Sequence, residues 1–541
     1  MKKTFTKFGK LKFLARMSVR WTWKYLRFIL RHYCKFALIP WKFVRRLFPK
    51  KKLAKAIAAL PPFHPQTIVR DWGNGEALTI EDLRCGCVCL GQIGGGKTSG
   101  VGKHVMYGML AAGFGALVCC VKTEEREQIV KWATECGRAS DLIIVDTTAK
   151  FRFNFLKWES EQGAPGGVVL NTVAILEEIA KAVAKASGQS TQGGGDSKFW
   201  EDSLHLLLIQ LVSLPVFLGL DVSLTLLRDL LNSAPTSYEQ MTDEVWRENS
   251  VLWMALSQAD ELTLKASPQI RTDFEQCRNF WLVDFTLLAP KTRSIITMTF
   301  GTLVQPIIMG FLNQIFCRDT NVRPEETFDG RIIVVDCPIQ ELRLVGKIAN
   351  LIFKYCTQIA ILRRKQPTQP GTYLRPVVIY ADECHYVLSD HDQMFQTTAR
   401  SVAGCSFYLT QNRDNLLVAL GNNAAVDSLL SNLTNKFFCK NTGSTNEYAA
   451  NIIGKRYVDI TSTSVSHSGH NSGHNNSGTS NSEQYRFFVE PQRFTTLKHG
   501  GAGANNFVVE TIVFKSGSVF RNPMPDGEEF IPFKLLALSQ I

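Results

Sequence analysis

The residues with the clearest chemistry form one glycine-rich run. In a phosphate-binding loop, glycines let backbone N–H groups converge on phosphate oxygens, a lysine adds positive charge, and a hydroxyl ligates Mg²⁺. The run at 91–98, GQIGGGKT, has this pattern, follows an apolar segment expected to be a strand (87–90) and opens an expected helix (97–110). We therefore predict that ATP is bound by Gly91, Gly94, Gly95, Gly96, Lys97, Thr98 and Ser99. Thr98 is also the first predicted ligand of Mg²⁺.

Hydrolysis of ATP needs an acidic metal ligand and a base that polarises the attacking water. Asp ends the expected strands at 331–336 and 377–382. The segment 331–336 is followed by Cys337-Pro338, which offers no base, so we interpret Asp336 as a structural residue, with a supporting role behind the metal ligands as the alternative. The segment 377–382 is followed by a second carboxylate. We therefore assign Asp382 to Mg²⁺ and Glu383 to water activation.

A third expected strand, 406–410, ends at Gln411, which could sense the γ-phosphate. Arg400 and Arg413 flank it, and either could supply an arginine finger from a neighbouring subunit or form an ordinary salt bridge. These residues alone do not separate the two roles.

The elements that must hold these residues alternate between short apolar strands and helices. This alternation predicts an α/β fold with a doubly wound, mainly parallel sheet, of the P-loop (RecA-like) motor type. Between the strands at 142–146 and 331–336 the pattern is helical, which predicts an all-α insertion. The expected helices cover 168–186, 199–214 (ended by Pro215), 224–231 and 292–316. The expected domains are an arm (1–57), a motor (58–160 and 290–541) and the insertion (161–289).

Charge is distributed unevenly along the chain. Residues 1–60 contain 18 Lys and Arg and no Asp or Glu, whereas the remaining residues carry 43 basic and 48 acidic side chains. The basic, aromatic-rich arm suits the surface of an anionic membrane, and it could instead grip nucleic acid or be a tail without a fixed role. Because the remainder is mildly acidic, the overall basic charge of the chain does not indicate that the main body is a generic nucleic-acid binder.

Two C-terminal segments have distinct patterns. Residues 461–482 are rich in Ser, Gly, Asn and His and are expected to form a low-complexity loop, in which His467, His470 and His474 are linker residues rather than metal ligands. Residues 507–514 and 518–520 flank Lys515-Ser-Gly517 and are expected to pair as a hairpin.

Taken together, the motifs from about 85 to 520 resemble those of type IV coupling proteins, the TraG/TraD-type conjugation ATPases of the FtsK/HerA motor class. The resemblance is carried by the P-loop, the Lys122-Thr-Glu124 turn, the Asn154-Phe-Leu156 turn, Phe199-Trp200, VVIYADECHYV at 377–387, FYLTQNRDNL at 407–416 and Glu490-Pro-Gln-Arg-Phe494. The chain departs from the family at Cys120, Val121 and Thr123, and in having the basic arm where many members have two transmembrane helices.

The resemblance implies a homo-hexameric ring that threads DNA and links a relaxase or relaxosome to a type IV secretion channel. It also implies that Arg400 is the finger acting in trans, and a place at the cytoplasmic face of the bacterial inner membrane, or otherwise in the cytoplasm. Two other functions remain open. One is an FtsK/HerA-like translocase of double-stranded DNA without a secretion channel, and the other is a nucleotide-gated adaptor for protein cargo.

Overall fold

The computed structural model describes residues 60–73, 75–163, 167–186, 195–466, 476–524 and 527–540. The chain divides into two compact units, Met1–Thr67 and Ile68–Ile541. The expected arm (1–57) lies outside the described residues. Within the described ranges, no helix is both long and apolar enough to cross a membrane.

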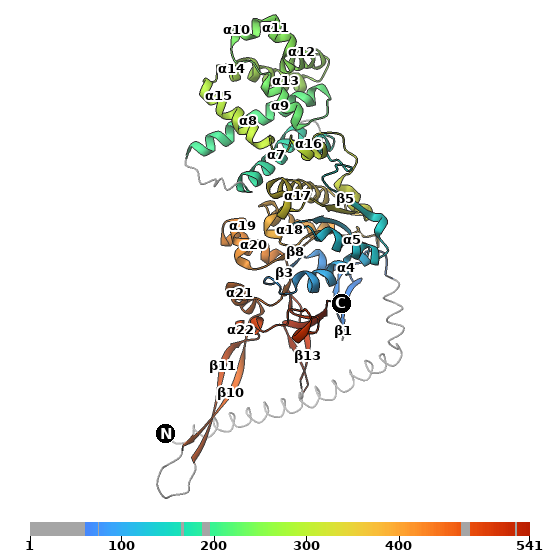
Figure 1. Ribbon diagram of the computed structural model, residues 1–541, viewed down its shortest axis with the longest axis vertical. Helices are drawn as coiled ribbons and strands as arrows, with labels where there is room; N and C mark the ends of the chain where they lie inside the picture. The colour runs from blue at the N-terminus through green and yellow to red at the C-terminus, as the bar shows by residue number, and fades with distance from the viewer. Residues whose placement is uncertain are drawn as a thin grey trace, which may run out of the picture. The chain divides into compact units, whose positions relative to one another are not determined.

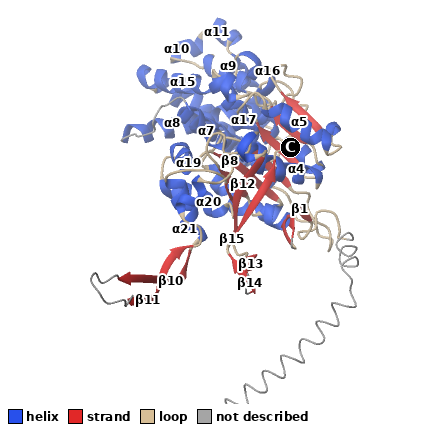
Figure 2. Ribbon diagram, turned by 60° about the horizontal axis from the view of Figure 1, so that its bottom comes forward, coloured by secondary structure: helices blue, strands red, loops and turns tan. Residues whose placement is uncertain are grey.

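The second unit is built on a nine-stranded sheet of order β15-β12-β9-β3-β8-β7-β4-β6-β5. The seven strands from β9 to β5 run parallel, and β12 and β15 extend the sheet antiparallel. Figure 2 shows these strands in red among the helices in blue. The predicted α/β fold with a mainly parallel sheet is confirmed. The strands are β3 (Cys87–Leu90), β4 (Gly115–Cys119), β5 (Leu142–Val145), β6 (Ile332–Val335), β7 (Val377–Ala381), β8 (Gly404–Thr410), β9 (Asn435–Phe438), β12 (Val508–Lys515) and β15 (Phe533–Ser539).

Helices connect the strands and cover the sheet. Most of the central strands are buried along their whole length, as expected for parallel strands covered on both faces. The helical segments outside the insertion are α3 (Ile80–Arg84), η1 (Lys97–Gly102), α4 (Lys103–Ala111), α5 (Glu125–Glu135), η2 (Ala139–Asp141), α6 (Phe155–Ser160), η4 (Pro324–Asp329), α17 (Ile339–Leu362), η5 (Cys384–Tyr386), α18 (His391–Ala399), η6 (Arg400–Val402), α19 (Arg413–Leu420), α20 (Asn423–Asn432), α21 (Ser444–Ile453), α22 (Pro491–Thr495) and η7 (Gly503–Asn505).

The interval between β5 and β6 is helical, as predicted, and its helices run in green to yellow-green in Figure 1. Two expected boundaries were wrong. One helix continues three residues past Pro215, because a proline in the last turn removes only one backbone donor. The expected helix over 292–316 is two helices, and Pro306, which has no backbone N–H to continue the hydrogen bonding of the first, lies between them. The helices are α7 (Gly167–Ala186), α8 (Gly195–Leu218), α9 (Leu224–Asn232), α10 (Tyr238–Thr242), α11 (Glu244–Asn249), α12 (Val251–Thr263), α13 (Pro268–Asn279), η3 (Phe280–Asp284), α14 (Phe285–Leu287), α15 (Pro290–Val304) and α16 (Gly310–Phe316).

The expected loop over 461–482 is largely a β-ribbon, so that prediction was wrong. β10 (Lys455–Ser466) and β11 (Asn476–Phe487) pair antiparallel in continuous register from Lys455↔Phe487 to Ser466↔Asn476. In β10 the β-branched residues Thr461, Thr463 and Val465 alternate with Ser, a pattern that suits an exposed strand even though it builds no core. His467, His470 and His474 lie outside the described residues.

The expected hairpin around 515–517 was also wrong. β12 pairs with β15 on one side and β9 on the other, and β13 (Phe520–Met524) pairs with β14 (Gly527–Ile531). A third small sheet joins β1 (Ile68–Gly73) to β2 (Glu76–Thr79). The apolar strand β12 gains more by entering the large sheet than by pairing with the next short segment, because burial there covers both of its faces.

A fully buried ion pair joins α17, α18 and β8. Lys354 Nζ contacts Asp392, whose other oxygen accepts from Gln358 Nε2 at 2.8 Å and from Tyr408 Oη at 2.6 Å. Burial alone would raise the pKa of Asp392, but the charge and hydrogen bond of Lys354, with hydrogen bonds from Ser389 N–H and Tyr408, together outweigh it and hold this pKa below its usual value. The network therefore keeps a carboxylate ionised inside the core.

Lys354→Met is expected to lower the free energy of unfolding by about 3–5 kcal/mol, because it leaves a buried carboxylate without its cation. Urea unfolding measures the loss. The matched control is Lys157→Met, which breaks the solvent-exposed pair with Asp221 (2.7 Å) and should cost about 1 kcal/mol or less. Equal losses in the two variants would show that burial adds nothing to the Lys354 pair.

Candidate functional site

The parallel strands bring the predicted site residues to one edge of the sheet. The phosphate-binding loop follows β3, Gln411 follows β8, and Asp382-Glu383 follows β7. These three strands are neighbours, with β8 in the middle. Because parallel strands end at the same edge, residues far apart in sequence meet there.

The glycines of the loop meet two separate requirements. Gly94 and Gly96 have φ of +67° and +83°, a region that side chains disfavour. A Cβ on Gly96 would also lie 2.5 Å from Cγ2 of Val509 on β12. Lys97 follows at the start of η1, and its side chain is buried. The loop thus curls tightly against β12 and directs Lys97 inward.

The two carboxylates meet the loop directly. Thr98 Oγ1 donates to Asp382 Oδ2 at 2.6 Å, and Lys97 Nζ lies 2.8 Å from Glu383 Oε1. Glu383 has a left-handed backbone (φ +51°), and its N–H donates to Asp382 Oδ1 at 2.9 Å. Such strain in a non-glycine residue is typical of functional sites.

The donor set fits Mg²⁺ and a water. A hydroxyl and a carboxylate in contact, Thr98 and Asp382, are oxygen ligands of the kind that Mg²⁺ prefers. The buried Oε2 of Glu383 has no hydrogen-bond partner among the described residues. A buried carboxylate oxygen of this kind needs a donor, which a water between Glu383 and the phosphates would supply.

The structure adds Lys122, to which the sequence assigned no role. Its Nζ lies 3.0 Å from Asp382 Oδ2 and 3.4 Å from Glu383 Oε1. Burial acts to lower the pKa of Lys122, but Asp382 and Glu383 outweigh it and raise the pKa. Lys122 therefore stays charged and links the two carboxylates across β4 and β7.

Glu125 is a second residue that sequence reasoning missed. Its Oε2 accepts from Val121 N–H at 2.7 Å, whereas the neighbouring Glu124 is exposed. Burial, followed by the charge of Asp382, raises the pKa of Glu125 to about 8. A consecutive Glu-Glu pair at a helix start was the available signal, but only the packing shows which of the two is buried.

Glu125→Gln is expected to change how stability depends on pH. A carboxyl group whose pKa is raised on folding favours the folded state most below its ordinary pKa near 4.5 and loses this contribution as pH rises through about 8. Gln is neutral at every pH. The urea midpoint of the variant should therefore increase relative to that of the wild type as pH rises from 5 to 8. Exposed Glu124→Gln is the control, and parallel curves for Glu125→Gln and the wild type would contradict the expectation.

The predicted sensor and finger residues lie in different places. Gln411 follows β8 at the same edge, and its carbonyl accepts from Asn441 Nδ2 at 2.6 Å. Arg400 lies in η6, before β8, and its guanidinium pairs with Glu81 while its side chain is 62% exposed. The seven residues of β8, at about 3.3 Å each, separate it by roughly 20 Å from the edge that holds the phosphate-binding loop. Arg413 pairs with Asp427 at 2.6 Å.

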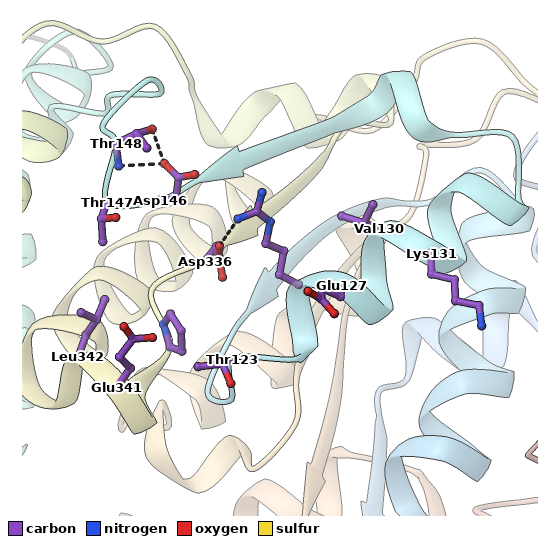
Figure 3. Close-up of a pocket in the computed structure, with 12 residues that line it drawn as sticks. Thr123, Glu127, Val130, Lys131, Asp146, Thr147, Thr148, Asp336, Glu341 and Leu342 are labelled. Carbon is purple, nitrogen blue, oxygen red and sulfur yellow. Dashed lines mark hydrogen bonds and ion pairs between the residues drawn. The ribbon is translucent and has the colours of Figure 1, made fainter.

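Asp336 lies outside this cluster, because it follows β6, and β4 lies between β6 and β7. It accepts from Arg126 NH1 at 2.9 Å, and burial raises its pKa. It lines a separate cavity of about 800 Å³ together with Asp146 and Thr148. Figure 3 shows these three side chains. The structural interpretation of Asp336 agrees with this ion pair.

Comparison with known proteins finds a family match and a shared fold. Residues 376–499 match the family model described as the TraM recognition site of TraD and TraG. The bacterial conjugative coupling protein TrwB, in its unbound monoclinic form, superposes with a TM-score of 0.54 at 11% identity, covering 90% of this chain and 92% of that one. TrwB with a non-hydrolysable ATP analogue gives 0.51 at 12% identity, covering 90% and 93%. No curated protein sequence matches the chain. The resemblance to TraG/TraD-type proteins and the P-loop fold are thereby confirmed.

Proposed function

We propose that this chain, which matches the TraG/TraD family over 376–499 and has the fold of the coupling protein TrwB, is an ATPase that moves DNA into a type IV secretion channel. The observation that carries the proposal is the cluster of Lys97, Thr98, Asp382 and Glu383 at one edge of the sheet. It contains the phosphate cation, the metal ligands and the base that ATP hydrolysis requires. A solved structure of TrwB holds ADP and Mg²⁺, which supports the same ligands here.

The roles of the residues follow from their contacts. The backbone N–H groups of 91–96 bind the phosphates. When ATP is bound, Lys97 would leave Glu383 and bind the γ-phosphate instead. Bound Mg²⁺ would neutralise charge developing on the phosphate oxygens. Glu383 accepts a proton from the attacking water, and Lys122 keeps both carboxylates in place. Gln411 stands at the strand end between the loop and Glu383, where loss of the γ-phosphate can be sensed.

The assembly and partners belong to the same proposal. Six chains form a ring around DNA, with Arg400 of one subunit completing the site of the next. The matched segment is named for recognition of TraM, which supports contact with a relaxosome protein. Residues 1–57 hold the ring at the cytoplasmic face of the inner membrane.

DNA is expected to stimulate ATP hydrolysis by the full chain, and DNA affinity is expected to fall steeply between about 50 and 200 mM salt. The mildly acidic motor offers few phosphate contacts per subunit, so binding is summed around the ring. Turnover is measured with single- and double-stranded DNA and with none. Absence of stimulation would favour the protein-cargo adaptor, and stimulation without a requirement for the gene in element transfer would favour a translocase unconnected to secretion.

A further inference from the structure

A loop from the C-terminal part of the chain lies against the phosphate-binding loop. We call residues 499–507, between α22 and β12, the 499–507 loop. The carbonyl oxygen of His499 is 3.1 Å from the position that a Cβ on Gly96 would take. The side chain of Val509, two residues after this loop, packs against both Gly96 and Gly100. The 499–507 loop therefore borders the site on the side of β9 and β12.

The catalytic carboxylates lie on the opposite side of β3. In the sheet order, β8 and β7 follow β3 in one direction, and β9 and β12 follow it in the other. Lys97, Thr98 and Glu383 would hold the γ-phosphate end of a nucleotide. Its nucleoside end is then directed away from Glu383, towards β12 and the 499–507 loop.

A hydrogen-bonded chain ties this loop to the residue after Thr98. Gln540 Nε2 donates to Ser99 Oγ at 2.6 Å, and Gln540 Oε1 accepts from Gly501 N–H at 2.6 Å. Gln540 N–H donates to the carbonyl of Phe507 at 2.9 Å, and Phe507 N–H donates to that of Gly501 at 2.8 Å. Two hydrogen bonds of Gln540 thus link Phe507 to Ser99, which lies in the first turn of η1.

The backbone of the loop is built for a special conformation. Gly500, Gly501 and Gly503 all have positive φ, and a Cβ on Gly500 would collide with the Gln540 amide. Asn506 and Phe507 also have positive φ, of +45° and +57°. A bulky residue in this region is strained, and such strain persists where the surroundings impose it. The phenylalanine is nevertheless 37% exposed rather than buried in the core.

We propose that the 499–507 loop forms the nucleoside subsite of the P-loop, and that Phe507 stacks on the base of the bound nucleotide. The proposal rests on the proposed nucleotide-binding function and adds the recognition of the nucleoside to it. Every base offers a π-face, so stacking tolerates different bases. We therefore expect ATP and GTP to use the subsite alike.

The test compares binding of ATP, GTP and inorganic tripolyphosphate to the full chain by titration calorimetry. Phe507→Ala is expected to weaken ATP and GTP about 10-fold, within the range for loss of one base stack, and to leave tripolyphosphate unchanged because it has no base. Phe507→Tyr should keep wild-type affinity. Phe530→Ala removes another exposed aromatic, 57% exposed on β14, and is the matched control.

Three results would overturn the proposal, and they differ in meaning. Unchanged ATP affinity in Phe507→Ala would show that the ring does not contact the base. Equal loss of tripolyphosphate affinity would show that the ring supports the phosphate-binding loop instead. If the wild type bound neither ATP nor tripolyphosphate, the nucleotide-binding function itself would fail together with the subsite.

Discussion

Glu383→Gln is expected to lower ATP hydrolysis by about 10²–10⁴-fold while ATP binding persists, because the amide cannot take a proton from water. The change keeps the shape of the side chain and its position beside Lys97. It also removes the negative charge that competes with phosphate for Lys97, so ATP affinity should stay equal or increase. Single-turnover hydrolysis and equilibrium binding of ATP measure the two effects separately.

Two comparison variants separate effects on ATP hydrolysis from effects on ATP binding. Lys97→Ala removes the phosphate cation and should lose both binding and hydrolysis. Glu341→Gln alters a carboxylate in the separate cavity beside Asp336 and should leave both unchanged. If Glu383→Gln hydrolysed ATP at the wild-type rate, another group would have to act as the base, and the assignment of Glu383 would be wrong.

Arg400→Ala is expected to lower ATP hydrolysis by about 10³-fold or more, the scale of an arginine finger, without affecting ATP binding in its own subunit. The reason is position. Arg400 lies before β8, at the sheet edge away from its own phosphate-binding loop, so the proposed finger role requires the site of another subunit. In the single chain its guanidinium pairs with Glu81, and it is exposed enough to leave that partner.

Mixing two inactive variants provides the sharper measurement. Arg400→Ala keeps a complete P-loop, and Lys97→Ala keeps Arg400. In a mixed ring, some interfaces join an intact P-loop to an intact arginine, so part of the activity should return. Arg413→Ala, which breaks a pair with Asp427 inside one chain, is the control and should retain activity. Normal hydrolysis by Arg400→Ala, or no recovery in the mixture, would contradict a finger acting in trans.

The amino-acid pattern was sufficient for the parts of the site that are local in sequence. The glycines, Lys97 and Thr98 lie within the eight consecutive residues 91–98. The strands that precede the other predicted residues are short apolar runs, each followed by a polar residue. Because parallel strands end at one edge, the pattern also predicted that Asp382 and Glu383 would approach the loop. The structure places Thr98 against Asp382 and Lys97 against Glu383.

Contacts between distant segments could not be predicted in the same way. The choice of β15 and β9 as partners for β12, and the pairing of β10 with β11, depend on which surfaces become buried, and local propensity does not encode this. The roles of Lys122 and buried Glu125 depend on a neighbouring strand that carries Asp382.

Spacing and hydrophobic alternation are local features of the chain, and they were enough to predict the P-loop, the carboxylate pair and the α/β sheet that holds them. The pairing of Arg400 with Glu81, and the position of the 499–507 loop against the phosphate-binding loop, more than 400 residues away in the chain, became visible in the folded chain alone. The physical reason is that the order of strands in a sheet is set by long-range packing, and that order decides which ends become neighbours.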